Sequence, residues 1–181
     1  LMAQKGREMV RYADDFVILC ESQQEAEETL AEVRQWMEKA GLTLHPTKTC
    51  IVHERDRGGF DFLGYHFERG YKWPRRKSLE KFKETIRHKT PRLRPDGMGK
   101  IIQDINRTLT GWFGYFKHSH WTTFQPLDQW IRQRLRSILR KRHKGKGRAR
   151  GLDHQRWPNA YFVELGLISL ALARVKAANS L

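Results

Sequence analysis

The chain has 181 residues, with 35 lysines and arginines against 20 aspartates and glutamates, a formal net charge of +15 and an isoelectric point near 10.2. This length accommodates one sizeable domain or two small ones, and so positive a charge indicates a polyanionic partner, either nucleic acid or an anionic membrane surface. No apolar run approaches the roughly 20 residues that cross a bilayer, which excludes a membrane-spanning helix.

The charge is distributed unevenly along the chain. Residues 1–68 carry 8 basic and 13 acidic side chains, whereas residues 69–156 carry 25 basic and 6 acidic ones, a net charge of +19. The composition therefore divides the chain into an acidic first part and a basic second part, with a border near residues 69–78.

The first predicted elements are two strands, residues 9–13 and 16–20, which are rich in Val, Ile, Phe and Tyr. Asp14 and Asp15 separate them as a two-residue hairpin turn. Paired acids at a tight tip are suited to hard divalent cations such as Mg²⁺. A surface turn with acids chosen for turn chemistry is the alternative explanation, and the two residues alone leave both open.

A helix is predicted over residues 22–40. Ser22 and Glu25 form a capping box at its start, apolar residues follow at helical spacing, and Gly41 is a good C-terminal stop.

Further strands are predicted at residues 42–44, 49–53, 60–67 and 71–73. The first two flank a turn at residues 45–48, and the last two flank a turn at residues 68–70. Gly64 interrupts the third strand, where it indicates a close approach of the backbone to another element.

From residue 78 the apolar period becomes helical. Helices are predicted at residues 78–89, 101–116, 127–142, 159–165 and 169–178, with a flexible basic loop at residues 143–151. Strands with one helix, followed by helices only, indicate an α+β fold that ends in a helical bundle.

The basic helices are the second candidate site. Solvated Lys and Arg faces would explain a single helix of this kind. A net charge of +19 over residues 69–156 exceeds what solubility requires, and a surface that binds phosphates explains it better. The aromatic residues of this part recur mostly at helical spacing, which favours core packing over base stacking: Trp112, Phe113, Tyr115, Phe116, Trp121, Trp130 and Trp157.

Tyr12-Ala13-Asp14-Asp15 resembles the catalytic motif of reverse transcriptases, in the form found in proteins encoded by group II introns. Residues 41–49 resemble the next palm motif, and Phe62-Leu63-Gly64-Tyr65 resembles the primer grip. The segments 111–116, 127–128, 156–162 and 166–167 resemble the thumb, or maturase-specific, region. These matches follow the family order over nearly the whole chain.

The resemblance implies the C-terminal portion of a group II intron-encoded reverse transcriptase and maturase. Residues 1–77 would be the last part of the palm, with the primer grip at Leu63, Gly64 and Tyr65. Residues 78–181 would be the helical thumb, or maturase (X), domain.

For catalysis, the resemblance implies that Asp14 binds Mg²⁺ in a two-metal polymerase site, with Asp15 as its partner. Lys48 occupies the position of the palm lysine, which assists pyrophosphate departure; an ordinary solvated turn lysine is the alternative. In this family the third catalytic carboxylate, the fingers and the template-binding motifs lie upstream. We therefore expect the chain to be inactive unless such a segment completes it in cis or in trans.

The implied partners are intron RNA and the duplex of RNA template and DNA primer, in a bacterial cytoplasmic, nucleoid-associated or ribonucleoprotein location. The basic residues expected to contact RNA are Arg75, Arg76, Lys77, Lys81, Arg132, Arg136, Arg140 and Lys144. The alternative function is a non-catalytic maturase module that stabilises folded intron RNA.

Overall fold

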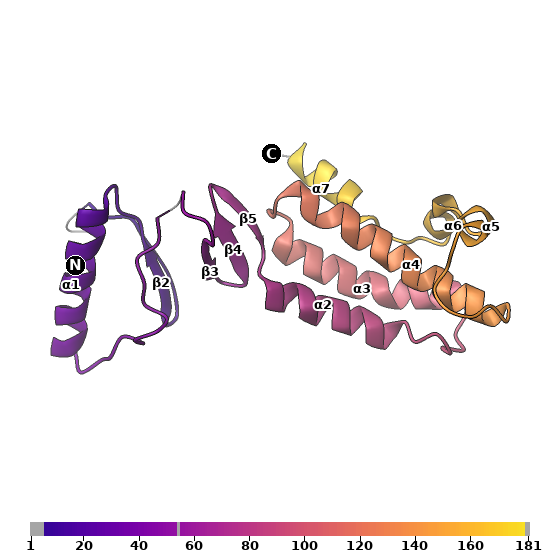
Figure 1. The fold of residues 1–181 in the computed structure, drawn as a ribbon, viewed down its shortest axis with the longest axis horizontal. Helices are drawn as coiled ribbons and strands as arrows, with labels where there is room; N and C mark the ends of the chain where they lie inside the picture. Colours follow the sequence, from indigo (N-terminus) through magenta and orange to yellow (C-terminus); the bar gives the residue numbers. More distant parts are fainter. Residues whose placement is uncertain (1–5, 54, 180–181) are drawn as a thin grey trace. The chain divides into compact units, whose positions relative to one another are not determined.

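The computed structural model describes residues 6–53 and 55–179. The chain forms two compact units (Figure 1): unit 1 comprises Leu1–Leu63 and Phe67–Gly70, and unit 2 comprises Gly64–His66 and Tyr71–Leu181. Small parts of the expected palm and thumb segments, at residues 1–5, 54 and 180–181, lie outside the described residues. Within the described ranges, no helix combines the length and hydropathy needed to cross a bilayer.

Unit 1 begins with an antiparallel hairpin of β1 (Met9–Tyr12) and β2 (Asp15–Ile18), in which Tyr12 lies opposite Asp15. The two loop residues are therefore Ala13 and Asp14, so the predicted turn at Asp14-Asp15 is wrong by one residue. Ala13 has a φ of 50°. A positive φ at the first loop position is typical of the tight turns whose twist matches that of the paired strands.

Helix α1 (Gln23–Lys39) lies close to its predicted range. The N–H of Glu25 donates to Ser22 Oγ at 3.1 Å, and the Glu25 carboxylate accepts from the N–H of Glu21 at 2.8 Å. These two contacts fix the start of the helix, although the Glu25 carboxylate binds the N–H of the residue before Ser22 rather than that of Ser22 itself. Thr29 and Val33 are its buried residues.

Residues 42–53 contain no strand, so the predicted strands at 42–44 and 49–53 are wrong. The turn between them is present, because the N–H groups of Lys48 and Thr49 donate to the carbonyl of His45 at 3.3 and 3.1 Å. A short β-branched run becomes a strand only beside a pairing partner.

The second sheet has the order β3-β4-β5 and comprises Phe60–Phe62, Tyr65–Glu68 and Tyr71–Pro74. The single strand predicted over residues 60–67 is therefore a hairpin. Leu63 and Gly64 have positive φ values of 46° and 80° and reverse the chain. The hairpin predicted through Arg69 and Gly70 is present.

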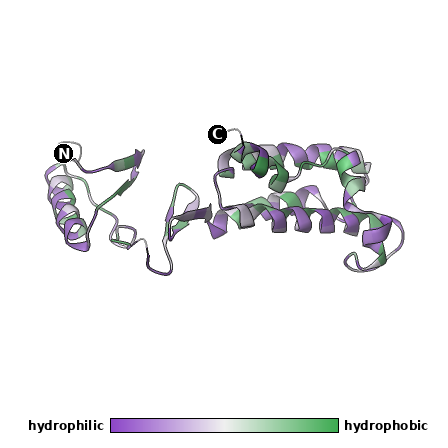
Figure 2. Cartoon of the chain, turned by 90° about the horizontal axis from the view of Figure 1, so that it is seen from above, coloured by the Kyte–Doolittle hydropathy of each residue, from purple (hydrophilic) through white to green (hydrophobic). Residues whose placement is uncertain are grey.

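The helices of unit 2 are α2 (Arg76–Lys89), α3 (Met98–Phe116), α4 (Phe124–Arg142), α5 (Leu152–Arg156), α6 (Asn159–Glu164) and α7 (Leu170–Ala178). A 3₁₀ helix, η2 (Trp121–Thr123), precedes α4. Helix α2 begins two residues before its predicted start, and α5 was not predicted. Hydrophobic and hydrophilic residues alternate around the longer helices (Figure 2). The α+β fold class is confirmed.

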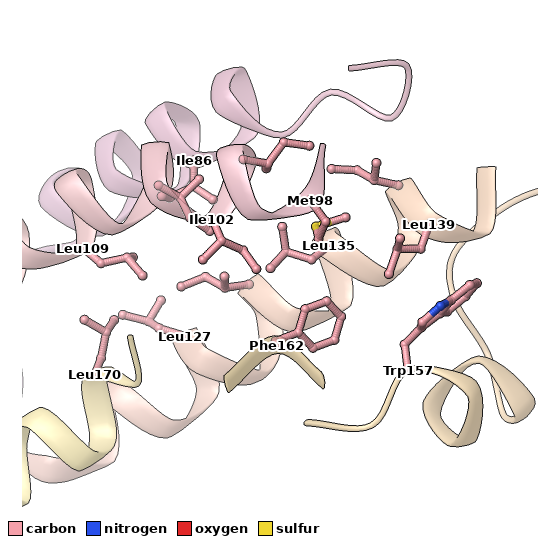
Figure 3. Packing of buried hydrophobic residues seen from close by; sticks show 14 of the residues in the cluster. Ile86, Met98, Ile102, Leu109, Leu127, Leu135, Leu139, Trp157, Phe162 and Leu170 are labelled. Carbon is pink, nitrogen blue, oxygen red and sulfur yellow. The ribbon is translucent and has the colours of Figure 1, made fainter. Parts of the chain in front are cut away.

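The core of unit 2 lies between α2, α3 and α4, and residues of α6 and α7 pack onto it (Figure 3). Phe116 and Trp157 are buried, as predicted from the sequence. Tyr115 and Trp121 are 55% and 65% exposed, so the prediction that they pack in the core is wrong. The cluster comprises Phe82, Ile86, Met98, Ile101, Ile102, Ile105, Leu109, Phe124, Leu127, Ile131, Leu135, Ile138, Leu139, Trp157, Phe162 and Leu170.

A buried aspartate of α4 holds the start of α7. Asp128 is 4% exposed, and its carboxylate accepts from Ser169 Oγ at 2.7 Å and from the N–H groups of Leu170 and Ala171 at 2.9 and 3.1 Å. The first N–H groups of a helix have no partner within the helix. A side chain of α4 therefore caps α7.

A buried arginine of α4 holds the segment between α5 and α6. Arg136 is 3% exposed, and its guanidinium donates to the Trp157 carbonyl at 2.8 Å and to Asn159 Oδ1 at 2.7 Å. It also lies 5.1 Å from the centre of the Phe162 ring. Burial, and then the charge of Arg132, lowers the pKa of Arg136.

Candidate metal site and nucleic-acid interface

The hairpin tip presents Asp14 in the loop and Asp15 at the first position of β2, both exposed. Arg11 Nε donates to the Ala13 carbonyl at 2.9 Å and fixes the loop from one side. Within the described parts of the chain, no hydrogen bond or ion pair engages either carboxylate. Both are therefore open to a cation.

These two residues match part of the donor set that a magnesium ion uses. Mg²⁺ usually keeps several waters and binds one or two protein carboxylates together with phosphate oxygens of a substrate. Asp14 and Asp15 fit that description. Among the residues described, no group of three or more His, Cys, Asp or Glu side chains is placed to hold a metal ion. The tip alone therefore supplies two carboxylates at most.

Lys48 lies in the turn that follows α1, and its side chain is exposed. The hydrogen bond of its backbone to His45 fixes the turn but not the ammonium group. In the part of the chain that the structure describes, no ion pair joins Lys48 to Asp14 or Asp15.

The expected primer-grip residues occupy the β3–β4 turn and the start of β4. The Gly64 carbonyl accepts from the Arg75 N–H at 2.9 Å and from Ser78 Oγ at 3.1 Å, which joins the turn to the start of α2. A Cβ at Gly64 would meet Ser78 Oγ at an ordinary 3.5 Å. The positive φ, rather than the expected close approach, is therefore the reason for glycine here.

Tyr65 is docked on the end of α3. Its hydroxyl donates to the Tyr115 carbonyl, and its ring lies 5.8 Å from that of Tyr115 and 5.0 Å from that of Phe116. The Lys72 ammonium lies 5.7 Å from the ring centre. Burial, and then the neighbouring Tyr115, raises the pKa of Tyr65.

The basic residues expected to contact RNA fall into two groups. Arg75, Arg76, Lys77 and Lys81 are exposed around the first turns of α2, and Arg76 pairs with Glu80 at 2.9 Å. The remaining residues belong to α4 and the loop after it: Arg132 is half-buried and Lys144 is exposed, whereas Arg136 lies in the core.

Arg140 is half-buried and engaged with the chain itself. Its guanidinium donates to the Lys146 carbonyl at 2.9 Å and to the Asp153 carboxylate at 2.5 Å. The N–H of Arg150 and the Arg140 charge lower the pKa of Asp153. Arg140 thus fixes the basic loop against α5, and neither it nor Arg136 presents a free charge to a ligand.

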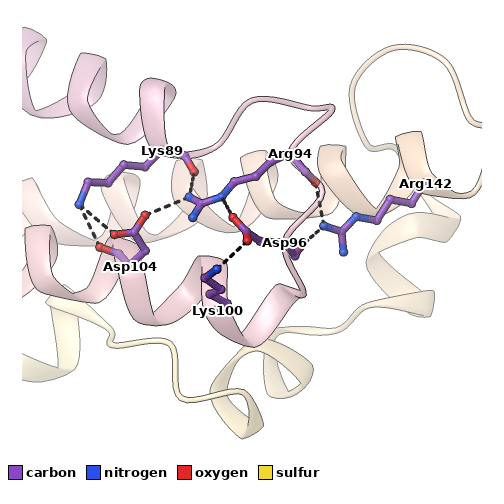
Figure 4. A network of polar contacts seen from close by, with 6 residues as sticks. All are labelled: Lys89, Arg94, Asp96, Lys100, Asp104 and Arg142. Atoms are coloured by element: carbon purple, nitrogen blue, oxygen red, sulfur yellow. Dashed lines mark hydrogen bonds and ion pairs between the residues drawn. The ribbon is translucent and has the colours of Figure 1, made fainter.

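The linker between α2 and α3 is held by a network of ion pairs and hydrogen bonds (Figure 4). Arg94 pairs with Asp96 at 2.8 Å and with Asp104 at 3.1 Å, and these contacts lower the pKa of both carboxyls. Lys89 pairs with Asp104 at 3.4 Å, and Lys100 pairs with Asp96 at 3.0 Å. Arg142 of α4 donates to the carbonyls of Arg94 and Asp96. The network leaves both acids neutralised by cations.

A cavity of about 340 Å³ lies between this linker and the loop after α4. Arg92, Lys141 and Lys146 line it together with Leu93, Gly145 and Gly147, and no carboxylate is among these lining residues. Burial, and then the charges of Arg87 and Arg92, lowers the pKa of Arg134 nearby. Sequence reasoning missed this cluster, because its cations come from a linker, a helix end and a loop that only the fold brings together.

Comparison with protein families gives two matches along the chain. Residues 1–67 match the family model of reverse transcriptase (RNA-dependent DNA polymerase), and residues 79–157 match that of the group II intron maturase-specific domain. The comparison with curated proteins found no match. The two matched families follow one another in the order that the sequence motifs imply. The chain therefore belongs to the group II intron reverse transcriptase/maturase family.

Proposed function

We propose that the chain binds folded intron RNA and the template–primer duplex through its helical part, within a cytoplasmic ribonucleoprotein. The observation that carries this proposal is the net charge of +19 over residues 69–156, much of it on exposed side chains, while Asp96, Asp104 and Asp153 are paired with cations. In this proposal residues 1–77 act as the end of the palm and residues 78–181 as the thumb, or maturase, domain.

The charge pattern suits recognition of an RNA backbone. A-form RNA is bound mostly through its shape, phosphates and 2′-hydroxyls, which calls for many dispersed cations rather than one pocket. The proposed contacts combine the exposed sequence candidates with the cations of the cavity: Arg75, Arg76, Lys77, Lys81, Arg92, Arg132, Lys141, Lys144 and Lys146.

Replacing the α2 cluster by glutamine tests this proposal. In the variant R75Q/R76Q/K77Q/K81Q, we expect affinity for a structured RNA to fall about ten- to a hundredfold at moderate salt, because four phosphate contacts are lost. A filter-binding or fluorescence-anisotropy titration measures the change.

The matched control removes four exposed charges of unit 1, in R34Q/K39Q/R55Q/R57Q. Its net charge equals that of the α2 variant, so it reports the effect of total charge alone, which we expect to be about threefold or less. Equal losses in the two variants would contradict a localised RNA surface.

A second proposed function is metal-dependent DNA synthesis. It is favoured by the two exposed carboxylates at the hairpin tip, within the segment that matches the reverse transcriptase family. Asp14 would hold Mg²⁺ with Asp15 as its partner, and Lys48 would act on the leaving pyrophosphate. Bound Mg²⁺ supplies electrostatic stabilisation of the attacking and leaving oxygens in phosphoryl transfer.

We also propose that a further palm and fingers segment, in cis or in trans, completes this site and supplies the third carboxylate. In unit 1, Thr29 and Val33 are the buried core residues among those described, whereas Val10 and Trp36 are 48% and 50% exposed. A two-stranded hairpin needs further strands or helices to be stable. Additional chain packed on these apolar residues would meet that need.

Asp14→Asn tests the catalytic proposal in a primer-extension assay with the completing segment present. We expect incorporation of deoxynucleotides to fall about a hundredfold or more, because a metal ligand is weakened, while RNA affinity stays unchanged. Asp56→Asn, also exposed in unit 1, is the control and should retain activity.

Three outcomes separate the alternatives. Full activity of Asp14→Asn contradicts the assigned metal ligand, and synthesis by the 181 residues alone contradicts the need for a completing segment. RNA binding without synthesis in any context supports the non-catalytic maturase module instead.

A further inference from the structure

An aromatic cluster is exposed on unit 2, where β5 meets the segment between α3 and η2. Its rings belong to Tyr71, Trp73, His120 and Trp121, and Tyr71 and Trp121 are 56% and 65% exposed. The His120 ring lies 5.0 Å from that of Tyr71, 5.5 Å from that of Trp73 and 5.6 Å from that of Trp121. Burial of large apolar rings is favourable, so two neighbouring rings with this exposure indicate a surface that a binding partner covers.

The backbone that carries these rings is well anchored. The N–H of His120 donates to the Lys72 carbonyl at 2.7 Å, which joins the segment after α3 to β5. His120 Nδ1 lies 2.8 Å from Thr122 Oγ1. The Ser119 N–H donates to the Phe116 carbonyl at 2.9 Å, and the Ser119 carbonyl accepts from Arg174 Nε at 3.3 Å. The backbone at the base of these rings is therefore fixed by contacts within the chain.

The surroundings of the cluster are positively charged. Burial, and then the charges of Lys72, Lys117 and Arg174, lowers the pKa of His118 next to the cluster. Among the described residues, no ion pair neutralises any of these three cations. Exposed rings also occur at protein interfaces, but cations without acids favour a polyanionic partner.

We propose that Tyr71 and Trp121 form a stacking platform for unpaired nucleobases of the bound RNA, with Lys72 and Lys117 contacting the adjoining phosphates. Bases within a duplex are already stacked, whereas unpaired bases are free to stack on aromatic side chains. The inference rests on the proposed RNA binding and adds that part of the bound RNA is single-stranded.

The test compares Trp121→Ala and Tyr71→Ala with the unchanged chain, on an unpaired RNA of about ten nucleotides, a length within the range that single-strand-binding domains occupy, and on a blunt-ended RNA duplex, which has no unpaired bases. We expect each variant to weaken binding of the unpaired RNA about tenfold, because one stacking contact is lost, and to change duplex binding less than about twofold. Trp121→Phe keeps an aromatic ring and should retain most of the affinity. Trp36→Ala removes a tryptophan of similar exposure from unit 1 and is the matched control.

The outcomes separate this inference from the proposed function. If the unchanged chain binds neither RNA, the proposed function fails. If it binds both RNAs and the alanine variants match Trp36→Ala, or weaken both RNAs equally, the platform is contradicted. Loss of self-association in Trp121→Ala without loss of RNA binding would mark a protein interface and would also overturn the platform.

Discussion

Asp128→Ala is expected to release α7 from the helical bundle and to lower the free energy of unfolding by about 3 kcal/mol. The carboxylate is 4% exposed and accepts three hydrogen bonds from Ser169, Leu170 and Ala171. Its removal leaves donors of the first turn of α7 without a partner, beside the fully buried Leu170. It also removes a negative charge from the positive end of the helix dipole.

Urea denaturation measures the change in stability, and amide hydrogen exchange locates it. Exchange should accelerate first in Leu170–Ala178. Gln129→Ala changes the exposed neighbour on α4 and should alter the free energy of unfolding by less than about 0.5 kcal/mol. A loss in Asp128→Ala no larger than that would show that the capping contact does not hold α7.

Arg136→Ala is expected to be similarly destabilising, by about 3 kcal/mol, because it leaves the buried Trp157 carbonyl unpaired and opens a cavity. The guanidinium is 3% exposed, and it contacts the Trp157 carbonyl, Asn159 Oδ1 and the Phe162 ring. Arg136→Met refills most of the volume without a buried charge, so it should lose less stability.

Arg132→Ala, one turn earlier on α4, provides the comparison for Arg136. Arg132 is half-buried and is a proposed RNA contact. Its loss should weaken RNA binding and leave the urea midpoint nearly unchanged, whereas Arg136→Ala should shift the midpoint strongly. A variant of Arg136 that folds with full stability but loses RNA affinity would show that Arg136 contacts RNA and does not stabilise the core.

The helical part of the fold was predictable, because α2, α3 and α4 bury apolar residues at regular helical spacing. The strands were harder to predict. The Asp14-Asp15 pair suits a turn, but cross-strand pairing decides the register, and the structure pairs Val10 with Val17 and places Asp15 in β2. At Leu63-Gly64 two successive positive φ values reverse the chain, where the alternating pattern alone indicates one continuous strand.

The candidate site, too, could be predicted from the sequence only in part. The motifs indicate Asp14 and Lys48 as individual candidates, whereas the spacing of the arginines in α4 does not tell which of them faces solvent and which the core. Arg132 and Arg136 are one turn apart, and only the second is buried. Trp121 is expected in the core with the other aromatic residues of the helical part, yet it lies on a 3₁₀ helix between two longer helices and is exposed.

The salt dependence of RNA affinity shows whether the helical part binds RNA through many phosphate contacts. With the proposed basic residues engaged, the logarithm of the association constant should fall against the logarithm of salt concentration with a slope of about −6. In R75Q/R76Q/K77Q/K81Q the slope should be shallower by about 3. A slope shallower than about −1 in the unchanged chain, or one that the α2 variant leaves unaltered, would mean that these basic residues do not bind RNA phosphates.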